Sequence, residues 1–290
     1  MTNNKLLLCT DLDRTLIPNG PQPESPEARQ IFHQMCASES LTLAYVSGRH
    51  RELVEDAISQ YDLPLPDYVV GDVGTTIYRV DGAEEWRHLT EWEDQIGRDW
   101  KGNSHSDLSR MFTDLSPLRQ QEEAKQNRYK LSYYISLDAD REQVDAVMRQ
   151  RLEAEDVNAT LIWSVDESDG IGLLDVLPAR ATKLHAVEFL MQSLGFSTMN
   201  TVFSGDSGND MPVLVSEIPA VLVSNAQPEV REEASDEATR HSTIETLYFA
   251  QGGFMSMNGN YSAGIIEGIA HYHPDMIESL LRNKPMTEPE

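Results

Sequence analysis

Four aspartates occupy positions from which they could share one cation. Asp11 and Asp13 directly follow the apolar residues 6–9, and Asp206 and Asp210 follow a second strand-like run at residues 200–205. A free aspartate has a pKa of about 3.9, so all four would be ionised near neutral pH. Two unit charges about 4 Å apart repel by roughly 4 kcal/mol at an effective dielectric constant near 20. A cluster of these oxygen ligands therefore calls for a hard cation, Mg²⁺ before Ca²⁺ or Mn²⁺.

The segments that would position these aspartates alternate between strands and helices. Helix-like patterns separate short apolar runs, a repetition that implies a parallel sheet with helices on both faces. In such a sheet the carboxyl ends of the strands meet at one edge, where ligands bind. The polar clusters at residues 11–13, 47–48, 71–74 and 205–210 follow four of the runs, so we expect them to face one crevice. The expected strands are residues 5–10, 41–46, 66–70, 200–205 and 219–226, and the expected helices are residues 27–37, 51–63 and 183–195.

A different pattern fills the middle of the chain. Three tryptophans occur in a polar, helix-like stretch, and two alternating segments at residues 130–137 and 160–165 flank a helical pattern at 140–155. This arrangement is typical of a small α+β module. We therefore predict an α/β protein with a doubly wound parallel-sheet core, residues 1–84 and 171–290, and an inserted α+β domain at residues 85–170. The tryptophans, which we expect to pack inside the inserted domain, are Trp86, Trp92 and Trp100.

Composition narrows the choice of partners. The formal net charge is −25, from 48 acidic and 23 basic residues. A field of that sign repels nucleic acid and anionic membrane surfaces, so neither is expected as a partner. A membrane span is not expected either, because no run of about 18 apolar residues occurs. The two cysteines and a start that is a poor export signal predict free thiols in a reducing cytoplasm. We expect a monomer.

The motifs carry a family resemblance. "DLDRTL", "SGR", the lysine in "ARATKLHAV" and "GDSGND" resemble the four motifs of the haloacid dehalogenase-like phosphatases, in the same order. "PDYVVGDVGTTIY", "KLSYYISL", "LLDVLPARATK", "SNAQPE" and "SAGIIEGIAHY" are similar to the sucrose-phosphate phosphatase branch and its relatives that act on other disaccharide phosphates. The resemblance covers nearly the whole chain. It implies a Mg²⁺-dependent hydrolase of sucrose 6-phosphate, in which the inserted domain is a cap.

The resemblance also implies how the first two aspartates divide the chemistry. Asp11 would attack phosphorus and form an aspartyl-phosphate. Asp13 would protonate the leaving sugar oxygen and then deprotonate the water that hydrolyses the intermediate. The metal would be held by side-chain oxygens of Asp11 and Asp206 and by the backbone carbonyl of Asp13.

Positive and neutral donors would hold the phosphate. Lys183 would be the fixed cation, kept in place by Asp210. This lysine opens a predicted helix, where the dipole disfavours a cation, and that placement favours a functional role. Ser47 would donate its hydroxyl, Gly48 would offer an amide at a helix start, and Asn209 would bind nearby.

Three further residues are expected to contact the sugar. Lys130, at the start of a cap strand, would reach the sugar hydroxyls, and Asp175 and Asn225 would bind them from the core side. The chain departs from the branch at Arg14, where many relatives have Asn or Gly, and we expect this change to leave the chemistry unaffected.

Several alternatives remain open at this stage. The chain is longer than its relatives at residues 18–25 and 251–260, so the substrate could instead be mannosylfructose phosphate or another glycosyl phosphate used to make a compatible solute. A sugar phosphomutase would keep the phosphoenzyme but transfer its phosphoryl group to sugar. A non-catalytic sugar-phosphate binder would not need both Asp11 and Asp13. A glycosyltransferase that supplies the phosphorylated disaccharide could associate with the protein.

Overall fold

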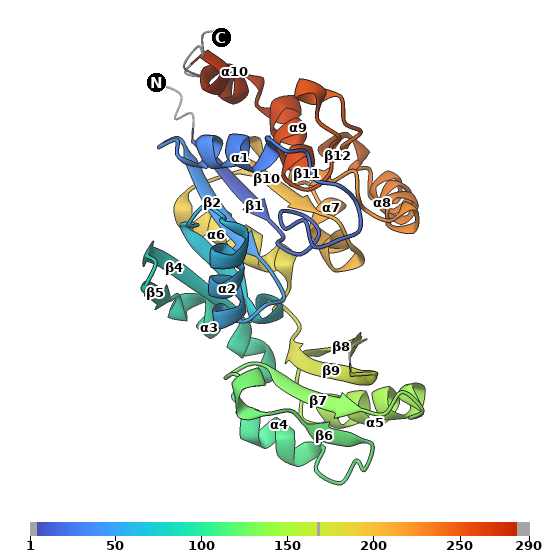
Figure 1. The fold of residues 1–290 in the computed structure, drawn as a ribbon. Coiled ribbons are helices and arrows are strands. Elements are labelled where there is room, and N and C mark those ends of the chain that lie inside the picture. The colour runs from blue at the N-terminus through green and yellow to red at the C-terminus, as the bar shows by residue number, and fades with distance from the viewer. Residues whose placement is uncertain (1–4, 167–168, 283–290) are drawn as a thin grey trace.

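The computed structural model describes residues 5–166 and 169–282, which form two β-sheets with helices packed against them (Figure 1). The larger sheet has eight strands in the order β12-β11-β10-β1-β2-β3-β4-β5. The strands from β12 to β3 are parallel, and β4 and β5 add to the edge in antiparallel orientation. Its strands are β1 (Leu6–Thr10), β2 (Leu41–Val46), β3 (Tyr68–Gly71), β4 (Thr76–Gly82), β5 (Glu85–His88), β10 (Thr201–Gly205), β11 (Ala220–Leu222) and β12 (Leu247–Phe249).

Side chains of β1 explain why helices cover both faces of this sheet. Successive residues of a strand point to opposite faces. Leu6 and Leu8 belong to one buried cluster, whereas Leu7 and Cys9 belong to the other. The first cluster is covered by α1 (Ala28–Cys36), α2 (Arg51–Tyr61), α9 (Ser262–Tyr272) and α10 (Pro274–Arg282), and the second by α3 (Thr90–Gly97), α6 (Lys183–Leu194), α7 (Met211–Leu214) and α8 (Pro228–His241). The expected doubly wound core is confirmed.

The smaller sheet has four antiparallel strands in the order β6-β7-β9-β8. Figure 1 shows β8 and β9 on the side nearer the larger sheet and α4 on the far side. A third apolar cluster lies between this sheet and its two helices. The elements are α4 (His105–Met111), β6 (Leu118–Gln120), β7 (Leu131–Ile135), α5 (Arg141–Ala154), β8 (Ala159–Asp166) and β9 (Ile171–Pro178).

The strands at the two ends of the inserted segment differ from the sequence interpretation. β5 pairs with β4 in the larger sheet, although residues 85–88 were predicted to lie in the inserted domain. Trp86 and Trp92 accordingly pack in the clusters of the larger sheet, and only Trp100 of the three lies in the cluster of the smaller one. At the other end, β9 belongs to the smaller sheet through residue 178, beyond the predicted limit of 170. The alternation of strands and helices predicts only parallel strands, so it cannot reveal an antiparallel strand that follows its neighbour without a helix between them.

A buried carboxylate joins the two segments that connect the sheets. Asp99 is 3 % exposed and accepts a hydrogen bond from the backbone amide of Arg180 at 2.8 Å. Its backbone carbonyl accepts another from the amide of Asn158, also at 2.8 Å. Within the described part of the chain, no helix is long and apolar enough to cross a membrane.

Candidate active site

The carboxyl end of β1 carries Asp11 next to a buried lysine. The backbone amide of Asp11 donates to the carbonyl of Ser204 on β10, which joins the ends of two neighbouring strands. Lys183, the first residue of α6, places Nζ 3.0 Å from Asp11 Oδ2. Both side chains are nearly excluded from solvent. An ammonium is disfavoured at a helix N-terminus, so the carboxylates around Lys183 must keep it there.

Asp210 is the second carboxylate that holds this lysine. Its Oδ1 lies 2.7 Å from Lys183 Nζ, and its Oδ2 accepts hydrogen bonds from the backbone amides of Asp206 and Ser207. The side chain is completely buried. Asn209 Oδ1 accepts a further hydrogen bond from Lys183 Nζ at 3.1 Å. The expected link between Asp210 and Lys183 is therefore present.

Asp206, at the end of β10, is flanked by two residues of the loop after β1. Thr15 Oγ1 donates to Asp206 Oδ1 at 2.9 Å, and Arg14 Nε lies 3.7 Å from Oδ2. Arg14, which we expected to leave the chemistry unaffected, lies beside a predicted metal ligand.

Burial dominates the electrostatics of the two predicted metal ligands. It raises the pKa of Asp11 to about 7, with Asp210 adding to the rise and Lys183 opposing it. It raises the pKa of Asp206 to about 6, again with a contribution from Asp210. Burial opposes the charge of Lys183, but Asp11 and Asp210 outweigh it and raise the pKa of this lysine above its usual range. The protein thus keeps more carboxylates at this point than its own ammonium can neutralise.

These carboxylates fit a hard cation. Oxygen atoms of Asp11, Asp206 and Asp210 all lie within 4.8 Å of one another. The family resemblance implies that Asp11 and Asp206 are the ligands in this group, and that assignment stays a prediction. An all-oxygen set of this kind suits Mg²⁺. The carboxylate of Asp13 does not belong to this group, and the predicted role of its backbone carbonyl stays a prediction.

The side chain of Asp13 is bound by an arginine that the sequence analysis did not assign. Arg49 Nε and Nη2 donate to its two carboxylate oxygens at 2.7 and 2.6 Å, and Asn19 Nδ2 donates at 2.7 Å. Partial burial favours the neutral acid, but the Arg49 bonds outweigh it and lower the pKa of Asp13. Arg49 is the third residue of "SGR", so the motif itself contained this signal. Asn19 had no such signal.

Replacing Arg49 with Lys should lower kcat by about 10²-fold. A lysine cannot reproduce the two parallel hydrogen bonds of a guanidinium, and small misplacements of a catalytic group can cost that much. Steady-state phosphate release measures the effect. Arg51→Lys is the matched control, since Arg51 lies two residues further on and pairs with Glu55 on α2. Equal kcat values for the two variants would show that Arg49 does not orient Asp13.

The predicted phosphate ligands lie at the same edge of the sheet, but one of them, Gly48, has a backbone position that differs from the prediction. Ser47 follows β2 directly and is buried, and its Oγ accepts a hydrogen bond from the amide of Arg49 at 3.2 Å. Gly48 is exposed in a bend, whereas α2 begins only at Arg51. The Gly48 amide is therefore not at a helix start, contrary to our expectation. Asn209 contacts Lys183, as described above.

Two of the predicted sugar ligands belong to the inserted segment, Asp175 within the smaller sheet and Lys130 just before one of its strands. Lys130 precedes β7 and is close enough to Asp72, which follows β3, to lower the pKa of that carboxyl against the larger effect of burial. Asp175 is on β9 and accepts a hydrogen bond from Ser132 Oγ on β7. The expectation that Asp175 lies on the core side is wrong, because β9 belongs to the smaller sheet.

Asn225 lies in the core, where its side-chain amide binds two backbone groups. Its Nδ2 donates to the carbonyl of Arg14 at 2.6 Å, and its Oδ1 accepts from the amide of Tyr261 at 2.8 Å. The side chain is only 3 % exposed. These contacts tie the loop before α9 to the loop after β1, so Asn225 is a structural link, and its predicted contact with the sugar stays a prediction.

Fold and site together define a haloacid dehalogenase-like hydrolase, with an aspartate after the central strand and a lysine against it. A solved haloacid dehalogenase-like hydrolase from Bacillus subtilis matches 92% of this chain and 91% of its own with a TM-score of 0.65 at 15% identity. Residues 4–273 match the model of the family described as sucrose-6F-phosphate phosphohydrolase. The chain belongs to this family.

Named relatives agree with this placement. A putative HAD-like hydrolase of Nitrosococcus oceani is 52% identical over 93% of this chain and 72% of its own. The mannosylfructose-phosphate phosphatase of Agrobacterium fabrum is 28% identical over 92% of this chain and 96% of its own. The sucrose-phosphatase of Synechocystis sp. PCC6803, solved with sucrose and phosphate, is 26% identical, covers 92% of this chain and 98% of its own, and has a TM-score of 0.68.

Proposed function

We propose that this protein is a Mg²⁺-dependent phosphatase that hydrolyses a phosphorylated disaccharide, with sucrose 6-phosphate as the first candidate, through an aspartyl-phosphate (an acyl phosphate) on Asp11. One observation carries the proposal: Lys183 and Asp11 form a buried pair at the end of the central strand, beside Asp206. A nucleophile, a fixed cation and a metal ligand are thus within reach of one phosphoryl group. The family assignment supports a phosphatase.

In the first step, a carboxylate oxygen of Asp11 attacks phosphorus, and the bond from phosphorus to the sugar oxygen breaks. Asp13 gives its proton to that oxygen, so the sugar leaves as an alcohol. Lys183 offsets the negative charge that the phosphoryl oxygens bring to the site. Mg²⁺, bound by Asp11 and Asp206, would neutralise further charge on the phosphoryl group.

In the second step, water attacks phosphorus while Asp13, now ionised, takes its proton. The bond between phosphorus and Asp11 breaks and releases inorganic phosphate. The Arg49 pair suits this base role, because it favours the ionised form of Asp13. The acid role requires that the pair first loosens, and the dianionic phosphate of an incoming substrate is a competing partner for the guanidinium.

A panel of sugar phosphates tests the substrate. We expect kcat/KM for sucrose 6-phosphate to exceed that for glucose 6-phosphate by at least about tenfold, because binding energy from the second ring contributes to catalysis. Phosphate release in the presence of Mg²⁺ measures it. A higher kcat/KM for mannosylfructose phosphate would instead favour the second candidate, which the relative from Agrobacterium fabrum supports. A preference for glucose 6-phosphate would contradict both.

Isotope-labelled water separates a hydrolase from a mutase. A hydrolase incorporates one oxygen of the solvent into the released phosphate, whereas a mutase passes the phosphoryl group to a sugar. We expect the label in phosphate. Binding without any turnover would identify a sugar-phosphate binder.

A further inference from the structure

The positively charged side chain of Arg14 lies next to Asp206, a predicted ligand of the metal. Its Nε is 3.7 Å from Asp206 Oδ2, and the side chain of Asp206 is 4 % exposed against 37 % for Arg14. We propose that Arg14 is a built-in counter-ion that competes with the divalent cation for Asp206 and so weakens metal binding. The inference rests on the proposed function, because it requires that Asp206 is a metal ligand.

The competition concerns one particular oxygen. Asp206 Oδ1 already accepts a hydrogen bond from Thr15 Oγ1 at 2.9 Å, which leaves Oδ2 as the less occupied oxygen of this carboxylate. Oδ2 is the atom that Arg14 faces. A cation that binds there comes close to the guanidinium, and two like charges at short range inside a protein repel strongly. The metal can therefore bind tightly only if the guanidinium moves away.

Two nitrogens of the guanidinium have no hydrogen bond to the described part of the chain. Arg14 Nε and Nη2 are buried and have no hydrogen-bond partner among the described residues. Buried donors without an acceptor are costly, so the attraction of Asp206 and the shape of the surroundings must keep the group in place.

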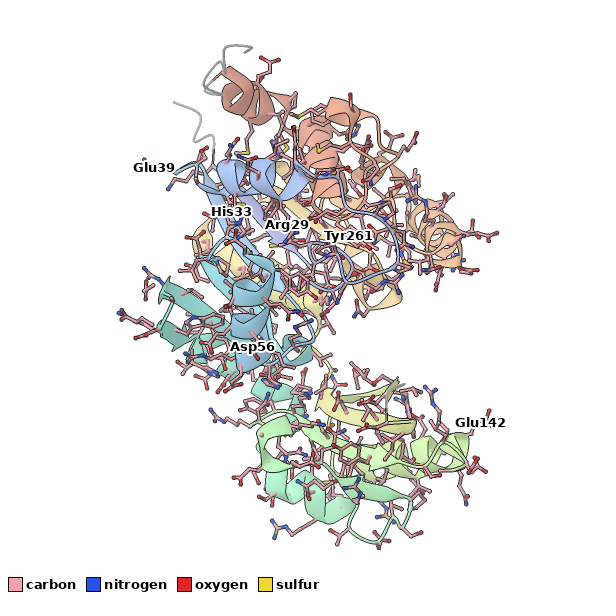
Figure 2. The ribbon with its side chains drawn as sticks, viewed as in Figure 1. Arg29, His33, Glu39, Asp56, Glu142 and Tyr261 are labelled. Carbon is pink, nitrogen blue, oxygen red and sulfur yellow. The ribbon has the colours of Figure 1, made fainter. Side chains whose placement is uncertain are left out.

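The backbone around Arg14 and an adjoining loop supply those surroundings. The amide of Arg14 donates to Asn19 Oδ1 at 2.8 Å, and its carbonyl accepts from Asn225 Nδ2. Gly20 lies against the guanidinium, because a β-carbon at that position would be 3.6 Å from Arg14 Nε and 2.8 Å from the hydroxyl of Tyr261. Tyr261, labelled in Figure 2, in turn donates to the carbonyl of Gln22. These contacts hold the backbone of Arg14, and the loop at Gly20 borders its guanidinium.

The backbone conformation of Arg14 suggests a suitable variant. Its φ of 59° lies in the left-handed region, which Asn and Gly tolerate better than other residues. Arg14→Asn therefore removes the charge without adding backbone strain, and Arg14→Gly does the same if a second neutral variant is needed. Arg14→Lys keeps the charge in the same backbone conformation.

Isothermal titration of the substrate-free protein with Mg²⁺ tests the inference. We expect the Kd of Arg14→Asn to fall by about tenfold, equivalent to about 1.4 kcal/mol, and that of Arg14→Lys to stay within about threefold of the wild-type value. Arg29→Gln is the matched control, with no change expected. Arg29 lies on α1 (Figure 2), is also 37 % exposed, and pairs with Glu24 at a distance of 2.8 Å.

The outcomes separate this inference from the proposed function. If the Kd of Arg14→Asn for Mg²⁺ is unchanged or higher, Arg14 does not compete with the cation and the inference is overturned. The metal site itself still stands in that case if the wild type binds Mg²⁺ and Asp206→Asn does not. A change of the same size in Arg29→Gln also overturns it, because the effect would then come from overall charge. If neither the wild type nor Arg14→Asn binds Mg²⁺, both the metal site and the inference fail.

Discussion

Replacing Asp11 with Asn should abolish turnover. The amide has nearly the shape of the carboxylate but cannot form an acyl phosphate, so the first step has no nucleophile. In other enzymes with a covalent intermediate, loss of the nucleophile costs on the order of 10⁶-fold in kcat, and we expect a loss of that size. Steady-state release of inorganic phosphate at saturating Mg²⁺ measures it.

A comparison with a charge change elsewhere shows whether this loss is local. Glu237→Gln removes a carboxylate on α8, where Glu237 pairs with Arg240 on the surface, and should leave kcat unchanged. Phosphate release by purified Asp11→Asn above the level of an inactive preparation would refute the assignment of the nucleophile.

Replacing Lys183 with Met should lower kcat by about 10³–10⁵-fold. This range is typical of the loss of a cation that stabilises a transferring phosphoryl group. The same change leaves Asp11 and Asp210 without their shared ammonium, whose Nζ lies 3.0 and 2.7 Å from their oxygens. Removing one partner of a buried ion pair typically costs about 3–5 kcal/mol of unfolding free energy. Chemical denaturation with a chelator present should show a loss of that order.

A control variant at an exposed lysine shows whether the loss of kcat and of unfolding free energy is specific to Lys183. Lys5→Met changes an exposed lysine before β1 and should leave both kcat and the unfolding free energy close to wild type. A Lys183→Met protein that kept kcat within tenfold of wild type would contradict the role of the lysine, whatever its stability.

Apolar runs allowed much of the core to be predicted. Strand β1 was expected at residues 5–10 and observed at Leu6–Thr10, and β2 was observed at Leu41–Val46, as expected. Strands buried on both faces are nearly continuous apolar runs, which are easily found. By contrast, β5 has the sequence EWRH, in which only Trp86 is buried. A strand at the edge of a sheet has little apolar pattern, and for this reason the boundary of the inserted segment was misplaced.

The residues that follow the central strands were also predictable, because topology alone brings their backbones together. Asp11 and Asp206 come from strands that are neighbours in the sheet. The contacts of Arg14 and Asn225 were not predictable, since each depends on how a loop turns after its strand. For example, the side-chain oxygen of Asn225 accepts a hydrogen bond only because the loop before α9 brings the backbone N–H of Tyr261 to it.

The central claim is that Asp11 carries the phosphoryl group during turnover, and acid quench of a single turnover tests it most directly. Borohydride reduction of the quenched protein converts an aspartyl-phosphate to homoserine, which mass spectrometry can place in the tryptic peptide of residues 6–14, between Lys5 and Arg14. We predict homoserine at position 11 and unmodified aspartate at position 13. Homoserine at position 13, in another peptide or nowhere while phosphate is still released would contradict the account.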